Sequence, residues 1–495
     1  MNLRPLSLAA SGVAVLALAA LAAVPNLLRP PAPSAVVEPI TVSVPAADRT
    51  LVCPEPIRSL IPGTEGDQEF SSAPAGSMSV TAVTVQALAP AAPIQLRPLG
   101  GEPIATAADV TTPAAVLATT IDTELLLTGQ MTSPLSAAIA GTAITSTPSG
   151  DLCGLSAASC QSPALEHWLV GADTTADSST RLVVVNPSAV AVTLEVEIFG
   201  AAGQVLDVPR TIAVAPQASQ SLLLESVAPG ESALVVHVTS SGRVATWLQT
   251  SRTRGLMPAG IDYVVPGAPP GTNLLIGPLP AADSQVDDPD VAILRLFAAQ
   301  DTTATIRLLG PEGPIEVPGL DQVDLAGGAV LDVGLGGIPA NPYIVQVSAD
   351  APIVAGAMAV DLSDDGSIEI AWAPASNTAA LDASGVIAIP PNVVAYLVAT
   401  LDGPQPVAYR LRLLQTDGAL QSTATLTLQP DVVAVVPLTG GEPVAAVAVD
   451  QPDEGAAGQV LWSVLLLDAA NQDLFSTVQP TGYPAGESTV RVWVE

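Results

Sequence analysis

Short runs of alternating apolar and polar residues fill most of the chain, and turn residues separate one run from the next. The stretch RLVVVNPSAVAVTLEVEIFG at 181–200 shows the pattern, with Val, Leu, Ile or Phe at half of its positions and Asn186-Pro187 between its two apolar runs. Runs rich in β-branched residues and bounded by turn residues are typical of strands. The stretch therefore predicts a pair of short strands.

The second of these strands opens a pattern that recurs twice. Each copy combines an apolar strand, a short polar turn, a glycine and the start of a further strand, and the copies are VEIFGAAGQV at 196–205, IRLLGPEGPI at 306–315 and LRLLQTDGAL at 411–420. A tight hairpin commonly needs a positive φ angle, which glycine adopts most easily, so hairpin turns are expected at Gly203, Gly313 and Gly418. Further strand-like segments follow each copy in the same order, which indicates three copies of one domain.

The number of strands in each copy indicates the fold. About seven short strands in some hundred residues is the count expected of an immunoglobulin-like sandwich, and the absence of long helical patterns between them disfavours a parallel α/β fold. The sequence therefore predicts an all-β chain with tandem immunoglobulin-like β-sandwich domains after an N-terminal transmembrane or signal segment. The expected parts are the signal or transmembrane segment 1–28, a Pro-rich linker 29–45, a β-rich domain with all three cysteines 46–175, and sandwiches at 176–282, 283–392 and 393–495. The domain at 46–175 lacks a clear copy of the recurring pattern.

The beginning of the chain has the pattern of an export segment. Arg4 precedes an uncharged run from Leu6 to Val24, which as a helix would be about 28 Å long, close to the hydrocarbon thickness of a bilayer. This length favours an uncleaved anchor, with a single N-terminal span in the cell membrane and the remaining domains outside the cytoplasm. Ala20-Leu21-Ala22 offers small residues at signal-peptidase spacing, so secretion after cleavage is the alternative.

The charge of the chain restricts its partners. Fifteen basic residues stand against 47 acidic ones, for a formal net charge of −32. Nucleic-acid binding is not expected, because that affinity comes from cations that displace counterions from phosphates. The acidic residues are scattered at turns, which indicates a soluble surface that resists association rather than a specific acidic tract.

Candidate catalytic and metal-binding residues are few. The two histidines, His167 and His237, have no second histidine or cysteine at zinc-ligand spacing, and no nucleophile, phosphate-binding or dinucleotide motif is present. Asp361, Asp364 and Asp365 lie near a turn glycine and are the metal-site candidates, because carboxylate oxygens are the ligands that Ca²⁺ prefers. Their spacing departs from the EF-hand loop, which favours a hairpin turn. No cofactor is expected.

Five tryptophans could present a face on which sugar rings stack. They are Trp168, Trp247, Trp372, Trp462 and Trp493. Two of them, Trp247 and Trp462, occur in equivalent strands of different copies, as core residues would.

Several segments resemble a family of exported actinobacterial proteins of unknown function. The segments are LVCPEP at 51–56, GLSAASCQSPALEHWLVGADTT at 154–175, LVVVNPSAVAVTLEVEIFG at 182–200 and VAPQASQSLLLESVAPG at 214–230. The resemblance covers most of the chain and implies a membrane-associated or secreted protein of the cell envelope. It carries over no catalytic residues. Cys153 is additional to the two cysteines of the family pattern.

Three cysteines permit one disulfide in an exported chain, so three pairings compete. In the chain-entropy model a bridge from Cys153 to Cys160 contributes about 2.5 kcal/mol, and a bridge from Cys53 to Cys160, which closes a far longer loop, contributes about 4.7 kcal/mol. The larger constraint favours Cys53–Cys160, and the family resemblance implies the same pair. The alternatives are the short Cys153–Cys160 bridge and three reduced, buried cysteines.

Two classes of function stay open, with a third that has less support. The leading interpretation is a non-catalytic interaction or scaffolding module of the cell envelope, with an unknown envelope protein as partner. The alternative is a module that binds surface glycans, which aromatic residues along an exposed cleft would favour. An enzyme acting on glycans is the third class. It has the least support because no clustered acid, base or nucleophile is visible in the sequence. It stays open because carboxylates scattered along a sequence can converge in a fold.

Overall fold

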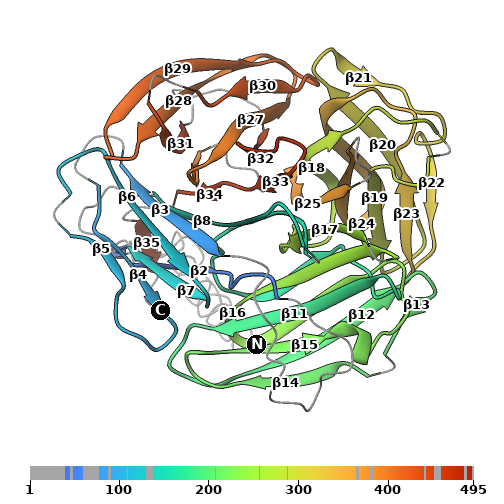
Figure 1. Cartoon of the computed structure of the whole chain (residues 1–495), viewed down its shortest axis with the longest axis horizontal. Helices are drawn as coiled ribbons and strands as arrows, with labels where there is room; N and C mark the ends of the chain where they lie inside the picture. The colour runs from blue at the N-terminus through green and yellow to red at the C-terminus, as the bar shows by residue number, and fades with distance from the viewer. Residues whose placement is uncertain are drawn as a thin grey trace, which may run out of the picture. The chain divides into compact units, whose positions relative to one another are not determined.

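The computed structural model in Figure 1 consists of strands and connecting turns. The structure describes residues 40–44, 48–58, 77–86, 91–108, 110–129, 138–150, 152–206, 208–255, 257–286, 288–363, 367–378, 384–439, 442–450, 459–483 and 488–492. These residues include the 3-10 turn η1 (Leu224–Ser226) and contain no α-helix, so the all-β class is confirmed. No helix in this part of the chain has the length and apolarity to cross a bilayer. The segment Leu6–Val24, expected to be the N-terminal span, lies outside it.

The chain divides into two compact units. One comprises 1–45 and 487–495, and in it β1 (Ile40–Val44) pairs antiparallel with β35 (Ser488–Val492). The other comprises 46–486. It contains four successive groups of strands, which are called modules 1 to 4 below.

The modules follow one another along the sequence. Module 1 comprises β2 (Arg49–Cys53), β3 (Met78–Val85), β4 (Ile94–Pro98), β5 (Ala105–Ala107), β6 (Ala114–Ile121), β7 (Leu125–Gly129), β8 (Ala138–Thr147) and β9 (Gly154–Ser159). Module 2 comprises β10 (Ala164–Val170), β11 (Ser178–Asn186), β12 (Val192–Gly200), β13 (Gly203–Gln204), β14 (Arg210–Val214), β15 (Ala218–Leu223), β16 (Val235–Arg254) and β17 (Met257–Val264).

Modules 3 and 4 continue the series. Module 3 comprises β18 (Gly271–Ala281), β19 (Ile293–Ala298), β20 (Thr302–Gly310), β21 (Gly313–Ile315), β22 (Val323–Leu325), β23 (Val330–Gly334), β24 (Asn341–Leu362) and β25 (Ile368–Asn377). Module 4 comprises β26 (Gly385–Ala388), β27 (Val393–Asp402), β28 (Val407–Gln415), β29 (Leu420–Leu428), β30 (Ala434–Pro437), β31 (Val444–Asp450), β32 (Gln459–Asp468) and β33 (Phe475–Val478), and the short β34 (Thr481–Gly482) follows it.

Every module pairs its strands in the same order. Module 1 forms the sheets β5-β4-β7-β2 and β6-β3-β8-β9, and module 4 forms the corresponding sheets β29-β28-β31-β26 and β30-β27-β32-β33. In modules 2 and 3 a single long strand, β16 or β24, takes the place of two strands and pairs in both sheets. The β-rich domain without a copy of the recurring sequence pattern is therefore a fourth module with the same topology.

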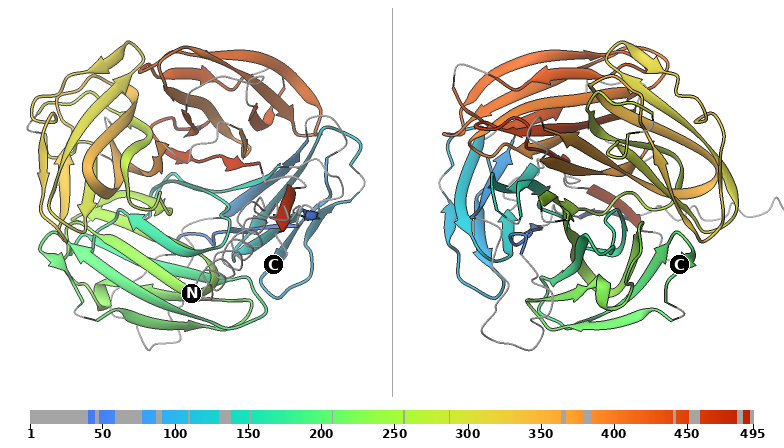
Figure 2. Two further views of the ribbon diagram at one scale, coloured as in Figure 1. Left: turned by 180° about the vertical axis from the view of Figure 1, so that it is seen from behind. Right: turned by 45° about the vertical axis from the view of Figure 1, so that its right-hand side comes forward.

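Apolar clusters connect the modules into a closed series. Leu51 of module 1 shares a buried cluster with Trp247 of module 2, and Val170 of module 2 shares one with Phe297 of module 3. A third cluster joins module 3 to module 4, and a fourth, across Val83 and other alanine and valine residues, joins module 4 back to module 1. This arrangement resembles a four-bladed β-propeller (Figure 2) rather than clear tandem immunoglobulin-like sandwiches.

The module starts differ from the expected domain boundaries. Strands β10, β18 and β26 precede residues 176, 283 and 393, yet each pairs with the strands that follow it. The reason is that these strands lie before the recurring pattern, in segments that resemble loops because of their prolines and glycines. The hairpin prediction is confirmed, because Gly203, Gly313 and Gly418 follow the turns with φ angles of 120°, 108° and 81°.

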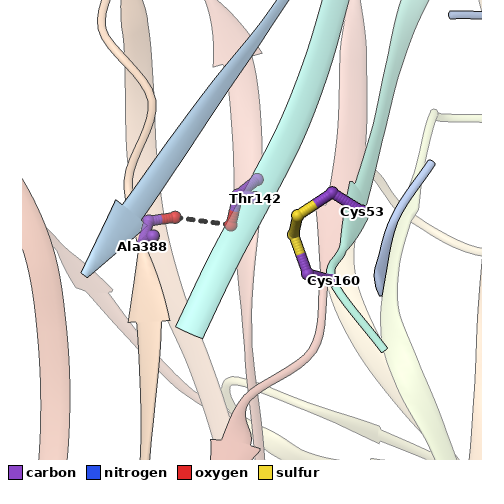
Figure 3. The surroundings of a disulfide bond; sticks show 4 residues. All are labelled: Cys53, Thr142, Cys160 and Ala388. Carbon is purple, nitrogen blue, oxygen red and sulfur yellow. Dashed lines mark hydrogen bonds between the residues drawn. A yellow bond between two sulfur atoms is a disulfide. The ribbon is translucent and has the colours of Figure 1, made fainter. Parts of the chain in front are cut away.

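One disulfide joins the first strand of module 1 to the end of its last strand. Cys53 and Cys160 are bonded and buried, and they are the pair that the sequence favoured. Figure 3 shows the bridge beside Thr142 of β8, whose hydroxyl donates a hydrogen bond of 2.7 Å to the carbonyl of Ala388 in module 4. Cys153 is outside this bridge and packs against the core of module 4.

Candidate functional site

A cavity of about 350 Å³ lies where residues of modules 1 and 2 meet β33 and the residues that follow it. We call it the polar cavity. Its polar lining residues include Arg49, Gln161, Glu166, His167, Thr477 and Gln479. Between them the wall is formed by small apolar residues, among them Ala158, Val265, Pro266 and Pro480. No aromatic side chain lines the cavity in the described part of the chain.

Arg49 is the cation of the polar cavity. Its Nη1 donates a hydrogen bond of 2.6 Å to the carbonyl of Gly482, and its Nη2 donates one of 3.3 Å to the hydroxyl of Ser162. No carboxylate among the described residues forms an ion pair with it. Burial lowers the pKa of this guanidinium, yet an arginine stays protonated in a protein. A positive charge with two neutral acceptors therefore faces the cavity.

Three buried polar atoms around the cavity lack a hydrogen-bond partner among the described residues. They are Gln161 Oε1, Thr477 Oγ1 and Gln479 Nε2. A buried polar atom without a partner costs free energy, on the order of 1–3 kcal/mol. All three atoms are covered by protein, so they belong to the packing behind the cavity wall and are not open contacts for a ligand.

Glu166 lies at the rim and is engaged by its own neighbours. Its Oε1 accepts hydrogen bonds of 3.0 Å from both the indole N–H of Trp168 and Nε2 of His237. These bonds lower the pKa of the Glu166 carboxyl, the bond from Trp168 most. His237 also contacts Glu197 through Nδ1 at 2.8 Å, and its ring stacks on Trp168. The carboxylate is thus part of a surface cluster rather than poised as a general base.

His167 is held by the backbone. Its Nε2 lies 2.9 Å from the carbonyl of Val244, and burial lowers the pKa of the imidazole. The ring is therefore neutral at pH 7 and donates to a carbonyl, and it takes no part in a metal cluster. No group of three potential metal ligands occurs in the described part of the chain.

A second cavity, of about 360 Å³, lies between modules 2 and 3. Its three arginines are each paired with an acid: Arg252 with Asp173, Arg254 with Asp290, and Arg295 with Asp332. The guanidinium of Arg295 also lies over the ring of Trp372. Because its charges neutralise one another, this cavity has the character of a module interface, and the polar cavity is the better candidate for a binding site.

The structure describes one of the three calcium-site candidates. Asp361 lies on β24, where burial raises the pKa of its carboxyl. Asp364 and Asp365 lie outside the described residues. Asp361 is therefore not shown to share a site with either of them.

Most of the described tryptophans are buried core residues. Trp247 and Trp462 are fully buried at equivalent strands of modules 2 and 4, and Trp372 is buried as well. Trp168 is half-buried and packs near Phe199 and Phe297. Trp493 lies outside the described residues. The described tryptophans therefore form no exposed face on which sugars could stack.

A comparison with protein-family models finds one match, to a family of unknown function, DUF5719, over residues 104–439. That range covers about two thirds of the chain. The chain belongs to the DUF5719 family. No curated protein matches the chain. The matched range contains Gln161, Glu166 and His167 of the polar cavity, whereas Arg49, Thr477 and Gln479 lie outside it.

Sequence reasoning missed the polar cavity. Arg49 and Gly482 are separated by 433 residues, and the residues between them give no sign that the two meet. The only available hint was the scarcity of basic residues, which makes each arginine without a nearby acid noteworthy. Histidines and aspartates attracted attention instead because of their general chemistry.

Proposed function

We propose that the protein is a non-catalytic interaction module of the cell envelope that holds a partner protein at the polar cavity. The observation that carries the proposal is a cavity lined by Arg49, a cation that has no carboxylate partner among the described residues. Its potential acid–base groups are already engaged, Glu166 by His237 and Trp168, and His167 by a backbone carbonyl. Such a site is suited to binding rather than to proton transfer.

The surrounding fold supports a rigid binding surface. Buried arginine–acid pairs lie at the interfaces between modules, with Arg181 on Glu55 at 2.6 Å, Arg295 on Asp332 at 2.7 Å and Arg412 on Asp450 at 2.7 Å. The disulfide fixes Cys160 beside the cavity. A pre-organised site loses less conformational entropy when a partner binds.

A location outside the cytoplasm is part of the proposal. A disulfide that closes a long loop persists in oxidising compartments, and the uncharged run from Leu6 to Val24 is suited to membrane insertion. Fractionation of cells that express the full chain, with sequencing of the mature N-terminus, tests this. Recovery of the intact N-terminus in the membrane fraction supports an anchor. Soluble protein beginning near Ala23 supports secretion, and recovery in the cytoplasm rejects both.

Photo-crosslinking tests the interaction site. A benzophenone amino acid placed at Ser162, on the rim of the polar cavity, is compared with one at exposed Thr425 on β29. In cells that naturally produce the protein, we expect one recurrent protein crosslink from position 162 that position 425 does not give. Identical products from both positions, or none from position 162, would contradict the proposal.

Glycan binding is the alternative function. Among the described residues, the buried tryptophans and the lack of Phe, Tyr and Trp in the polar cavity remove the feature that would favour it. Carbohydrate attached to the crosslinked peptide at position 162, without a protein, would support glycan binding in place of the proposed function.

A further inference from the structure

We propose that the polar cavity binds the C-terminal carboxylate of a partner polypeptide, with Arg49 as its cationic anchor. The inference rests on the proposed function, because it specifies which part of the partner enters the cavity. It is argued from two features of the cavity: its charge, and the size and polarity of its walls.

Arg49 differs from the buried arginines at the module interfaces. Acidic residues outnumber basic ones by 47 to 15, and the buried arginines at the module interfaces, Arg181, Arg295 and Arg412, each contact a carboxylate. Arg49 contacts only a carbonyl and a hydroxyl in the described part of the chain. A guanidinium has five N–H donors and binds a carboxylate through two parallel hydrogen bonds. The missing carboxylate is therefore the group expected of a ligand.

The walls and the volume of the cavity favour a peptide over a sugar acid. Ala158, Val265, Pro266 and Pro480 form apolar surfaces that suit an aliphatic side chain. A sugar acid would place hydroxyl groups against these surfaces and would find no aromatic ring to stack on. The volume of about 350 Å³ is at the lower end of the range for ligand pockets, which suits about two terminal residues rather than a folded element.

Short peptides test the proposal directly. The purified full chain is mixed with pooled N-acetylated tripeptides that vary at the last two positions and carry either a free or an amidated C-terminus, and retained peptides are identified by mass spectrometry. We expect members of the free-acid pool to be retained and their amidated counterparts to bind at least tenfold more weakly. Arg49→Gln should abolish this difference, whereas Arg210→Gln, at an exposed arginine on β14, should preserve it.

Two further variants separate binding from folding. Arg49 also connects module 1 to Gly482, so its replacement can reduce stability. Arg49→Lys keeps the positive charge and should retain a preference for free acids. Ala164→Phe places a large side chain at the cavity without altering Arg49, and it should abolish retention while the melting temperature stays within a few degrees of the wild type.

Several outcomes would overturn the inference. They are equal retention of the free and amidated pools, unchanged retention by the Arg49→Gln variant, and binding of glucuronate when no tripeptide binds. If the protein crosslink from position 162 persists in cells while all tripeptides fail, the C-terminal inference is wrong and the proposed function stands. If that crosslink is also absent, the proposed function is wrong as well.

Discussion

The carboxyl group of Asp262 accepts a hydrogen bond of 2.6 Å from the backbone N–H of Trp372, which joins the last strand of module 2 to the last strand of module 3. Ser476, on the last strand of module 4, contacts the same carboxyl group at 3.3 Å. Glu369 on β25 accepts a hydrogen bond of 2.7 Å from the backbone N–H of Leu155 in module 1. Two buried carboxyl groups thus connect the last strands of all four modules.

These two carboxyl groups should make the protein less stable as the pH rises. Burial raises the pKa of Asp262 and of Glu369 well above the usual range. Between the unfolded and folded pKa values the folded state binds more protons, so the free energy of unfolding falls with increasing pH, by at most about 1.4 kcal/mol per pH unit for each group. Asp262→Asn should therefore make the melting temperature depend less on pH above about pH 4. At neutral pH the variant should have a higher melting temperature than the wild type.

The control for this prediction is Asp283→Asn, at an exposed carboxylate. Its melting temperature should follow the wild-type dependence on pH. A wild-type protein whose stability is constant or increases from pH 5 to pH 8, with Asp262→Asn parallel to it, would contradict the prediction.

The disulfide should contribute strongly to stability. Cys53 and Cys160 are separated by 107 residues, and closing a loop of this length is worth about 4.7 kcal/mol in the chain-entropy model. Replacing both cysteines with alanine should lower the free energy of unfolding by about this amount, measured with urea under non-reducing conditions. Cys153→Ala is the matched control and should have a much smaller effect. A peptide map that joins Cys153 to either partner would show that the pairing is wrong.

Arg295 should be critical for the contact between modules 2 and 3. It forms two hydrogen bonds with Asp332 and donates to the carbonyls of Ala172 and Leu234. Arg295→Met leaves these acceptors without their donor and should cost about 3 kcal/mol, because a broken buried pair leaves an uncompensated charge. Arg254→Met removes an exposed pair with Asp290 and should cost less than about 1 kcal/mol. Equal decreases in the free energy of unfolding of the two variants, measured with urea, would contradict this prediction.

Two equivalent hairpin glycines should tolerate substitution differently. Gly313 and Gly418 both have positive φ angles, so alanine at either position costs about 1–2 kcal/mol in backbone strain. A Cβ at Gly313 meets no atom within 4 Å, whereas at Gly418 it would lie 2.0 Å from the carbonyl oxygen of Ala114. Gly418→Ala should therefore cost a further ~1–3 kcal/mol from overpacking. Thermal unfolding of the two variants gives the comparison, and a Gly313→Ala variant as unstable as Gly418→Ala would contradict it.

The sequence predicted the local structure better than the assembly. Hairpins at Gly203, Gly313 and Gly418 follow from a requirement within a few residues, so they could be read directly. The relation of module 1 to the other three could not be read in this way, because its equivalent hairpin, β4 to β5, has a different turn that includes Pro98 and Gly100. Strand order is conserved between modules by pairing across the sheet, and the residues of a single turn do not reveal it.

The candidate site depends on contacts that span the chain. Arg49 and Ser162 belong to modules 1 and 2, and Gly482 follows module 4. Their meeting requires the modules to close on one another, which the repeated pattern alone does not determine. The disulfide was predictable because loop length and the number of cysteines limit the choices, whereas no comparable restriction applies to an arginine.

The long strand β24 has a consequence for how this chain can change during evolution. Its first half pairs with β20 and its second half with β19, so both sheets of module 3 share one continuous backbone. Side chains alternate between the two faces of a strand, so one inserted or deleted residue near the middle would turn the inward side chains of one sheet outward. Length variation among related sequences should therefore be confined to turns, such as the hairpin between β20 and β21, and be absent from Asn341–Leu362.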